Sequence, residues 1–151
     1  MNSIIIGSDH AGFSLKEKFK IYLEKKGFYV KDLGTYSEKR CDYPEFAFGV
    51  ASLVSSGKFK RGILICKSGI GNSIVANRFR GVRAALCYNT KAARLSREHN
   101  DSNILVLGSG FVSENKSKEI LRAWLDTGFQ GGRHKRRLDL IKKLEKKLGC
   151  R

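Results

Sequence analysis

Short apolar runs alternate with longer amphipathic segments along almost the whole chain, and this alternation constrains the fold more than any other feature. Five of the apolar runs are predicted to be strands, at residues 3–7, 28–33, 62–66, 84–87 and 104–108. Strands that alternate with helices are typical of a parallel sheet covered on both faces. We therefore predict an α/β fold, a single Rossmann-like three-layer domain over residues 1–151 with a five-stranded parallel sheet of order 2-1-3-4-5.

The segments between these strands are expected to be helical. The predicted helices span residues 13–26, 45–55, 74–79, 90–99 and 115–126. Gly27 stops the first helix and Pro44 suits the first turn of the second. A glycine-containing stretch at 128–132 separates this body from a last basic helix at 135–148, so the C-terminal arm and helix, about 128–151, are expected to pack on a partner subunit.

Composition narrows the classes of function without choosing among them. The 151 residues include 30 Lys+Arg and 14 Asp+Glu, and the net charge of +16 favours anionic partners such as phosphate metabolites or nucleic acid. A solvated basic surface is the alternative interpretation. No stretch approaches the roughly 20 apolar residues of a membrane span, and no signal-peptide pattern is seen, so we expect a soluble, cytoplasmic protein.

The cysteines show no pattern of pairing. Four are present, with no C-x-x-C pair and no nearby histidines, in a chain large enough to fold without disulfides. We expect free thiols at Cys41, Cys66, Cys87 and Cys150.

Two unusual loops follow the first and third predicted strands. In an open parallel sheet, ligands bind beyond the carboxyl ends of the strands where the strand order reverses, which here lies between these two strands. The first loop, residues 7–12, sets Asp9 beside His10 between glycines that permit a tight turn. A carboxylate and an imidazole in this position suit proton chemistry. A second interpretation stays open, in which Asp9 only caps the following helix.

The second loop, residues 66–73, leads into a helix. Its backbone N–H groups and the positive end of the helix dipole form a site for an anion, such as a phosphate or an enediolate oxygen. Cys66 ends the strand beside Lys67, and both features are expected to lower the pKa of the thiol and to supply a thiolate base. An inert core cysteine is the alternative.

A dinucleotide-binding site is not favoured. Gly69-x-Gly71 resembles part of the fingerprint, and Asp32 resembles its ribose-binding acid. Ile74, however, stands where the third glycine is required, and the motif follows the third strand.

Two further clusters carry charged or titratable groups. His99 and Asn100 lie just before the last strand, where His99 could act as an acid or base or could only interact with a helix dipole. Arg133 and Arg137 stand one helical turn apart and continue an apolar stripe formed by Ile141, Leu144 and Leu148. Two arginines in this arrangement could bind one phosphate through charge-assisted hydrogen bonds.

Taken together, the motifs resemble those of the ribose-5-phosphate isomerase B and galactose-6-phosphate isomerase family. They are GSDHAG, DLGTYS with CDYPEFA, CKSGIGNSIVANRF, GVRAALC, SREHNDSNILVLG and GGRHKRRLDLI, in that order over nearly the whole chain. The resemblance implies an aldose–ketose isomerase of the non-oxidative pentose phosphate pathway that interconverts ribose 5-phosphate and ribulose 5-phosphate through a cis-enediol(ate). It implies no metal and no organic cofactor.

The same resemblance implies roles for individual residues. Cys66, assisted by Ser68, would move the proton between C2 and C1, and Asp9 and His99 would help to open the sugar ring. The residues implied to bind substrate are Tyr43 and Asn100 at the hydroxyls, the amides of Gly69, Ile70, Gly71, Asn72 and Ser73 at the enediolate, and His10, Arg133 and Arg137 at the phosphate. The partners implied are a phosphorylated sugar and further copies of the chain, as a homodimer or dimer of dimers with the active site shared between subunits, and neither a membrane nor nucleic acid.

The sequence departs from the family pattern at some positions. The family commonly has Gly-Thr where this chain has Lys67-Ser68. Members with a glutamate base carry it where this chain has Asn72, so this chain resembles the cysteine type. Many members have an arginine where this chain has Gly110, which removes one expected phosphate contact. Lys67, or the wider positive field, is expected to offset part of that loss.

Two other functions remain possible from sequence alone. The motifs contain the residues that move the proton, but they do not indicate how deep the sugar pocket is. An isomerase of a six-carbon sugar phosphate, such as allose or galactose 6-phosphate, is therefore an alternative. A nucleic-acid-binding α/β module would fit the charge, although no RNP-like aromatic pair is present.

Overall fold

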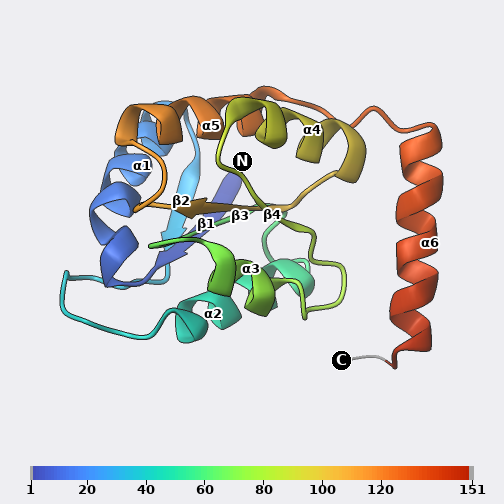
Figure 1. Cartoon of the computed structure of the whole chain (residues 1–151), viewed down its shortest axis with the longest axis horizontal. Coiled ribbons are helices and arrows are strands. Elements are labelled where there is room, and N and C mark those ends of the chain that lie inside the picture. Colours follow the sequence, from blue (N-terminus) through green and yellow to red (C-terminus); the bar gives the residue numbers. More distant parts are fainter. Residues whose placement is uncertain (1, 150–151) are drawn as a thin grey trace.

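The computed structural model describes residues 2–149 and shows strands alternating with helices (Figure 1). The strands are β1 (Ser3–Ser8), β2 (Tyr29–Asp32), β3 (Gly62–Cys66), β4 (Ala84–Leu86) and β5 (Ile104–Gly108). The helices are α1 (Phe13–Lys25), α2 (Tyr43–Ser55), α3 (Ile70–Ala76), α4 (Thr90–Asn100), α5 (Glu114–Asp126) and α6 (Arg133–Lys147), and a short 3-10 helix, η1, spans His10–Gly12. None of the helices described is long and apolar enough to cross a membrane.

The five strands form one parallel sheet, which confirms the predicted α/β class. The predicted strand order, 2-1-3-4-5, is wrong at one edge, because the sheet runs β2-β1-β3-β5-β4. All five residues of β5 are buried, whereas β4 is only half-buried. A strand that is apolar on both faces is stabilised inside the sheet, and the less apolar β4 is left at the edge. The reversal of strand order between β1 and β3 is as predicted.

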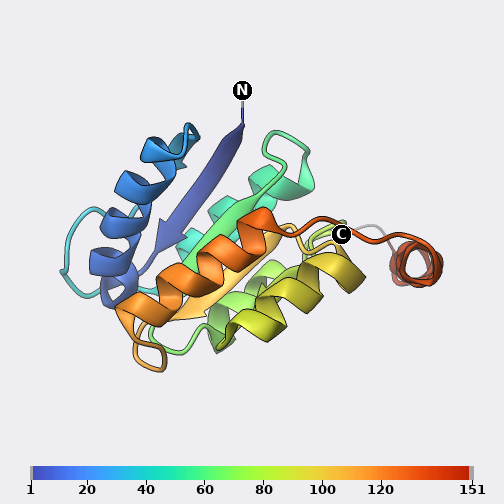
Figure 2. The same cartoon turned by 90° about the horizontal axis from the view of Figure 1, so that it is seen from above.

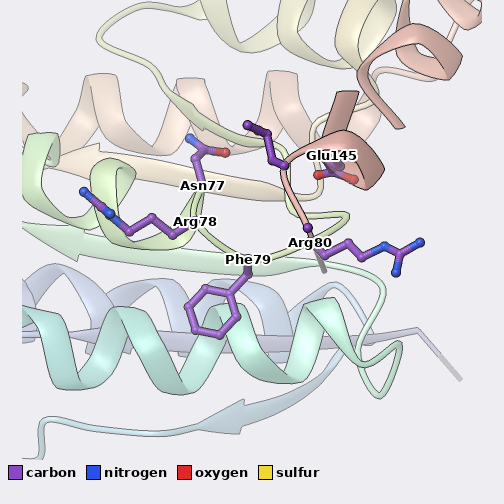
Figure 3. A pocket seen from close by; sticks show the side chains of 7 residues that line it. Asn77, Arg78, Phe79, Arg80 and Glu145 are labelled. Carbon is purple, nitrogen blue, oxygen red and sulfur yellow. The ribbon is translucent and has the colours of Figure 1, made fainter. Parts of the chain in front are cut away.

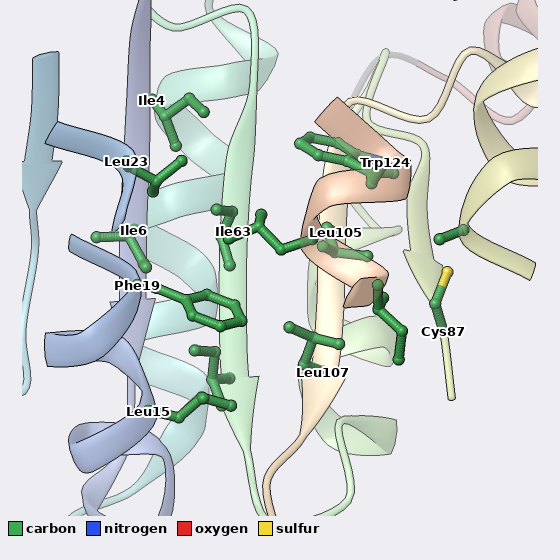
Figure 4. Close-up of a cluster of buried hydrophobic side chains, with 14 of the residues drawn as sticks. Ile4, Ile6, Leu15, Phe19, Leu23, Ile63, Cys87, Leu105, Leu107 and Trp124 are labelled. Carbon is green, nitrogen blue, oxygen red and sulfur yellow. The ribbon is translucent and has the colours of Figure 1, made fainter. Parts of the chain in front are cut away.

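Helices cover both faces of the sheet. Figure 2 shows α1, α5 and α4 side by side over one face, and Figure 1 shows α2 and α3 on the other. Successive side chains of a strand point to opposite faces, so Ile4 and Ile6 join the cluster under α1 and α5 (Figure 4), while Ile5 joins the cluster under α2. The central strands are therefore buried on both sides, and only their ends are free to carry polar chemistry.

Most element boundaries lie within two residues of the prediction, and one helix was predicted in the wrong place. The third helix was predicted at 74–79, but α3 begins at Ile70. Gly69 precedes it with a φ of 81°, so the chain turns sharply out of β3 and the helix starts at once. Residues 70–73, predicted as part of a loop, thus form the first turn of α3, which directs their N–H groups toward the end of β3.

Helix α6 lies apart from the layered body (Figures 1 and 2). The Gln130 N–H donates to the Glu98 carbonyl at 3.1 Å just before the helix, and the Gly81 N–H donates to Glu145 Oε1 at 3.1 Å near its end. The predicted apolar stripe is largely exposed, with Ile141, Leu144 and Leu148 at 45%, 56% and 78%. This stripe has room to contact another molecule.

The thiols described are free, as predicted. These are Cys41, Cys66 and Cys87, and Cys150 lies outside the residues that the structure describes.

Candidate active site

The first site loop is held against the end of β3. The Asp9 N–H donates to the Ile65 carbonyl at 3.3 Å, and the Asp9 side chain is only 6% exposed. Its Oδ1 accepts the N–H groups of Ala11 at 3.0 Å and Gly12 at 3.2 Å, so the capping interpretation describes this carboxylate well. Capping fixes Asp9 at the carboxyl edge of the sheet, where it also acts on the neighbouring thiol.

The Cys66 thiol ends β3 and is 4% exposed. Burial raises the pKa of this thiol above its ordinary value, and the nearby Asp9 carboxylate raises it further. The amides of Gly69, Asn72 and Ser68 lower it, and the Gly69 N–H donates to Sγ at 3.2 Å. The expectation of a lowered pKa was wrong, because burial outweighs the amides and the Lys67 side chain is directed toward Gly110.

The loop after Cys66 presents backbone donors at the start of α3. The Ile70 N–H donates to Ser68 Oγ at 3.1 Å, and the Ser73 N–H donates to the Gly69 carbonyl at 3.0 Å. The amides of Gly71 and Asn72 have no intrahelical partner at this helix start, and the Asn72 amide is directed toward the Cys66 thiol. The predicted anion site is thus narrower than the run from Gly69 to Ser73.

Tyr43, at the first position of α2, lies against this loop. A Cβ on Gly71 would stand 2.3 Å from the Tyr43 ring, so the phenol covers the backbone beside the thiol loop. The structure therefore brings together Tyr43, the thiol loop and the Asp9 loop, as predicted.

Two buried polar side chains at this edge lack a partner among the described residues. Both amide atoms of Asn72 are buried and unpaired, and so is the hydroxyl of Ser8, which the sequence analysis missed. Because an unpaired buried polar group is unfavourable, such groups commonly meet a ligand or water. Asn72 is therefore placed to contact a bound substrate.

A cavity of about 520 Å³ opens at the same edge, between the loops after β1 and β5. Its lining includes the side chains of His10, Lys18 and Lys67, and one carboxylate, that of Glu114. Lys18 is paired with Glu114 at 2.9 Å, which leaves Lys67 and the imidazole to meet an anion. His10 Nδ1 lies 3.2 Å from both the amide nitrogen and the carbonyl oxygen of Cys41.

Two aromatic residues beside the thiol loop were not predicted. Tyr88 follows β4, and its hydroxyl donates to the Ser68 carbonyl at 2.6 Å. Phe111, in the loop after β5, meets the Tyr88 ring edge to face, with ring centroids 5.7 Å apart. Both come from loops at the carboxyl ends of β4 and β5, which are neighbours in the sheet, and this adjacency brings the two rings together.

The structure does not bring His99 to Cys66 within one chain. His99 and Asn100 end α4, which leads into the first residue of β5, whereas Cys66 pairs in register with Gly108 at the last. Four strand steps separate these edges by roughly 13 Å. Within a single chain, His99 therefore does not share a pocket with Asp9 and Cys66.

At that far edge, His99 meets helix α6. Its ring stacks on the ring of His134, with centroids 4.2 Å apart and planes at 10°. Arg133 and Arg137 flank His134 on α6 and are exposed. The predicted site residues thus fall into two groups at opposite edges of the sheet, which we call the thiol half-site (Asp9, His10, Tyr43 and residues 66–73) and the arginine half-site (His99, Asn100, Arg133 and Arg137).

A second cavity, of about 210 Å³, lies between the end of α3 and the end of α6 (Figure 3). Its lining includes Arg78, Phe79 and Glu145 but no residue of either half-site. The chemistry is therefore better placed at the edges of the sheet than in this cavity.

Comparison with known proteins identifies the family. Residues 4–141 match the sequence model described as Ribose/Galactose Isomerase. The chain belongs to the ribose/galactose isomerase family. A curated family member, ribose-5-phosphate isomerase B of Escherichia coli, is 44% identical over 147 residues, which cover 97% of this chain and 99% of the relative.

Solved structures of family members share the whole fold. A ribose-5-phosphate isomerase B of Clostridium thermocellum is 48% identical, with a TM-score of 0.95 over 97% of this chain and 99% of that one. The enzyme of Mycoplasma genitalium, solved with bound ribulose-5-phosphate, is 43% identical, with a TM-score of 0.92 over 95% of this chain and 96% of that one. Both agree with the parallel sheet and its flanking helices.

Proposed function

We propose that this protein interconverts ribose 5-phosphate and ribulose 5-phosphate through a cis-enediol(ate), as a cytoplasmic enzyme of the non-oxidative pentose phosphate pathway. The observation that carries the proposal is the thiol half-site, where a buried thiol, a carboxylate and two helix N–H groups meet beside a cationic cavity. Aldose–ketose isomerisation needs these parts, because a base must move one proton while donors stabilise an oxyanion.

Cys66 is the proposed base. Its thiolate takes the C2 proton of the open-chain aldose as the C1 carbonyl electrons move onto O1, and it returns the proton to C1 as the carbonyl forms at C2. The hydroxyl proton passes from O2 to O1, and Ser68 is proposed to assist this transfer. The amides of Gly71 and Asn72 would stabilise the enediolate, and the unpaired Asn72 side chain would meet a sugar hydroxyl. Proton transfer by a placed base contributes about 10²–10⁴-fold to the rate.

The phosphate and the sugar ring require the arginine half-site. We propose that His99, Asn100, Arg133 and Arg137 of a second copy complete each thiol half-site in a homodimer, alone or in a dimer of dimers. Support comes from the separation of the two edges and from the exposed stripe on α6, which could bury apolar area against the partner. His99 of the second copy would then open the ring opposite Asp9, while the arginines and His10 hold the phosphate. A firmly held phosphate orients the carbon whose proton moves.

An isomerisation assay with ribose 5-phosphate tests the proposal. We expect turnover in the presence of a chelator, and loss of most turnover in Cys66→Ala with the far-UV circular dichroism unchanged. Retained turnover in that variant would remove Cys66 from its role, and no turnover in the wild type would refute the reaction. Parallel kinetics with allose 6-phosphate and galactose 6-phosphate test the six-carbon alternative, which a higher kcat/KM on either would favour.

A further inference from the structure

We infer that His134 is a positioning residue, which holds the imidazole of His99 and the guanidinium pair of Arg133 and Arg137 in one fixed arrangement. The inference rests on the proposed function for the roles of those three residues. The motif GGRHKRRLDLI contains His134 but implied no role for it, and the inference follows from the contact between two helices.

The contact is specific in geometry. The two imidazole rings lie parallel, within 10°, at a centroid distance of 4.2 Å. His134 is 4% exposed and is the one buried residue of α6, although its helical neighbours Arg133 and Lys135 are exposed. The ring of His134 is thus the side chain through which the start of α6 docks on the end of α4.

This docking sets the position of both arginines. Arg133 immediately precedes His134, and Arg137 lies three residues after it, on neighbouring turns of the same helix. The Gln130 N–H bond to the Glu98 carbonyl fixes the approach of the chain, and the Gly81 N–H bond to Glu145 ties the far end of the helix to the body. The ring stacked on His99 adds a contact at the start of the helix, between the two arginines, and at the same time holds the plane of His99.

The charge state of the stack follows from its surroundings. The groups that face His134 are His99 and Glu98 of α4 and Arg133 and Arg137 of α6. Burial, and then the charges of His99 and the two arginines, lower the pKa of His134, and only Glu98 opposes them. His134 is therefore neutral near pH 7, and its buried Nε2 has no partner among the described residues. Protonation would place a cation between cations and weaken the stack.

A purely structural histidine would behave differently. Its removal would lower the free energy of unfolding, while the surviving folded enzyme would keep its KM, its kcat and the environment of His99. A positioning residue, in contrast, changes these properties in the folded enzyme, because a displacement of about 1 Å at a reacting group can lower the rate about 10²-fold.

The test compares His134→Ala, which removes the ring, with His134→Phe, which keeps a flat ring but no titratable nitrogen. The exposed neighbour provides the control, Arg136→Ala. The assay uses ribose 5-phosphate near neutral pH, at about 7.5. Under these conditions we expect His134→Ala to raise KM about tenfold or more and to lower kcat about tenfold or more. We expect His134→Phe to stay within about threefold of the wild type and Arg136→Ala to match it.

A pH series adds a readout that a structural role would not change. As the pH falls below the ordinary histidine range, KM of the wild type should rise more steeply than KM of His134→Phe, because position 134 can gain a charge only in the wild type. The phosphate of the substrate titrates equally in both assays, so it does not contribute to the difference. Parallel profiles would contradict the proposed role of the neutral ring.

The NMR resonance of the His99 ring separates this inference from the proposed function. Loss of the stacked ring should shift this resonance in His134→Ala, and His134→Phe should retain a ring-current shift. An unshifted resonance, or wild-type KM and kcat in a folded His134→Ala, would overturn the inference while leaving the isomerase intact. An inactive wild type with the expected NMR shifts would refute the function but not the contact between the rings.

Discussion

Lys67 lies directly across Gly110, because the Lys67 Cγ is 2.9 Å from the point where a Cβ on Gly110 would stand. Any side chain at position 110 would meet the lysine stem, so the two positions share one space at the mouth of the cationic cavity. The resemblance of the motifs implies an arginine at this position in many family members. In this chain the stem of Lys67 lies in the space that a side chain at position 110 would need.

We expect Lys67→Met to raise KM for ribose 5-phosphate with little change in kcat. A hydrogen bond to a charged group contributes about 1.5–3 kcal/mol, and solvent screening of an exposed lysine reduces this. We therefore expect KM to rise about three- to tenfold. Initial-rate kinetics measure it, with the exposed Lys58→Met as a control that makes the same charge change. An unchanged KM would show that Lys67 does not contact the phosphate.

The Cys66 thiol should react as a thiol of raised pKa. Only the thiolate is alkylated, so the rate of Cys66 modification by iodoacetamide should rise with pH through values above the ordinary thiol range. Asp9→Asn removes a negative charge that raises this pKa, and asparagine can still cap the turn. The profile of the variant should therefore shift to lower pH.

Mass spectrometry of the peptide that contains Cys66 measures this profile, since Cys41 and Cys87 are also free thiols. Asp9→Ala, which loses the cap as well, separates the charge from the structure of the loop. An unshifted profile in Asp9→Asn would mean that the carboxylate is not a neighbour of the thiol in solution.

The shared site predicts complementation between inactive subunits. Cys66→Ala and His99→Asn lie in different half-sites, so a mixed dimer would hold one site with both defects and one with neither. Random pairing makes half of the dimers mixed, and roughly a quarter of all sites should then be active. Co-refolding the two variants and measuring turnover tests this. Activity no higher than that of either variant alone would place both residues in one subunit's site.

Removal of the Tyr88 hydroxyl should loosen the thiol loop. Its 2.6 Å hydrogen bond to the Ser68 carbonyl joins the β4 loop to the β3 loop, and a bond of this kind contributes about 1 kcal/mol. Tyr88→Phe should lower the free energy of unfolding by about that amount and also lower kcat. The exposed Tyr29→Phe is the control. Unchanged stability and turnover would mean that the loop after β3 keeps its position without the hydrogen bond from Tyr88.

The sequence predicted most of the sheet because the signals there are local. Residues 62–66 and 104–108 are continuous apolar runs between turn residues, and β3 and β5 have those bounds. The strand order was missed because it depends on which strand is the more apolar. Comparison of the Ala84–Leu86 run with the richer Ile104–Gly108 run would have placed β4 at the edge.

The parts of the candidate site that lie in a loop directly after one strand could be predicted from the sequence. Asp9, Cys66 and the start of α3 follow strands, so topology places them at one edge. A helix that returns between parallel strands ends at the opposite edge, and this rule alone separates His99 from Cys66. The stack of His99 on His134 could not be predicted, because it depends on how α6 docks, and no local pattern encodes that contact.

The last prediction compares alanine substitutions at Gly69 and Gly57. The two glycines share a backbone conformation but differ in their surroundings. Their φ angles are 81° and 78°, so an alanine at either position meets the same left-handed penalty of about 1 kcal/mol. At Gly69 the new Cβ would also stand 2.5 Å from Leu86 Cδ1 and 3.2 Å from the Leu107 backbone, whereas nothing lies within 4 Å at Gly57.

Gly69→Ala should therefore destabilise the protein by about 1–3 kcal/mol more than Gly57→Ala, as overpacking does in a filled core. It should also lower kcat, because Gly69 donates its N–H to Cys66 Sγ, while Gly57→Ala should leave kcat unchanged. Urea unfolding and steady-state kinetics measure both effects. Equal losses of stability in the two variants would mean that the turn after β3 can move away from β5, and that the thiol is not held as rigidly as its contacts indicate.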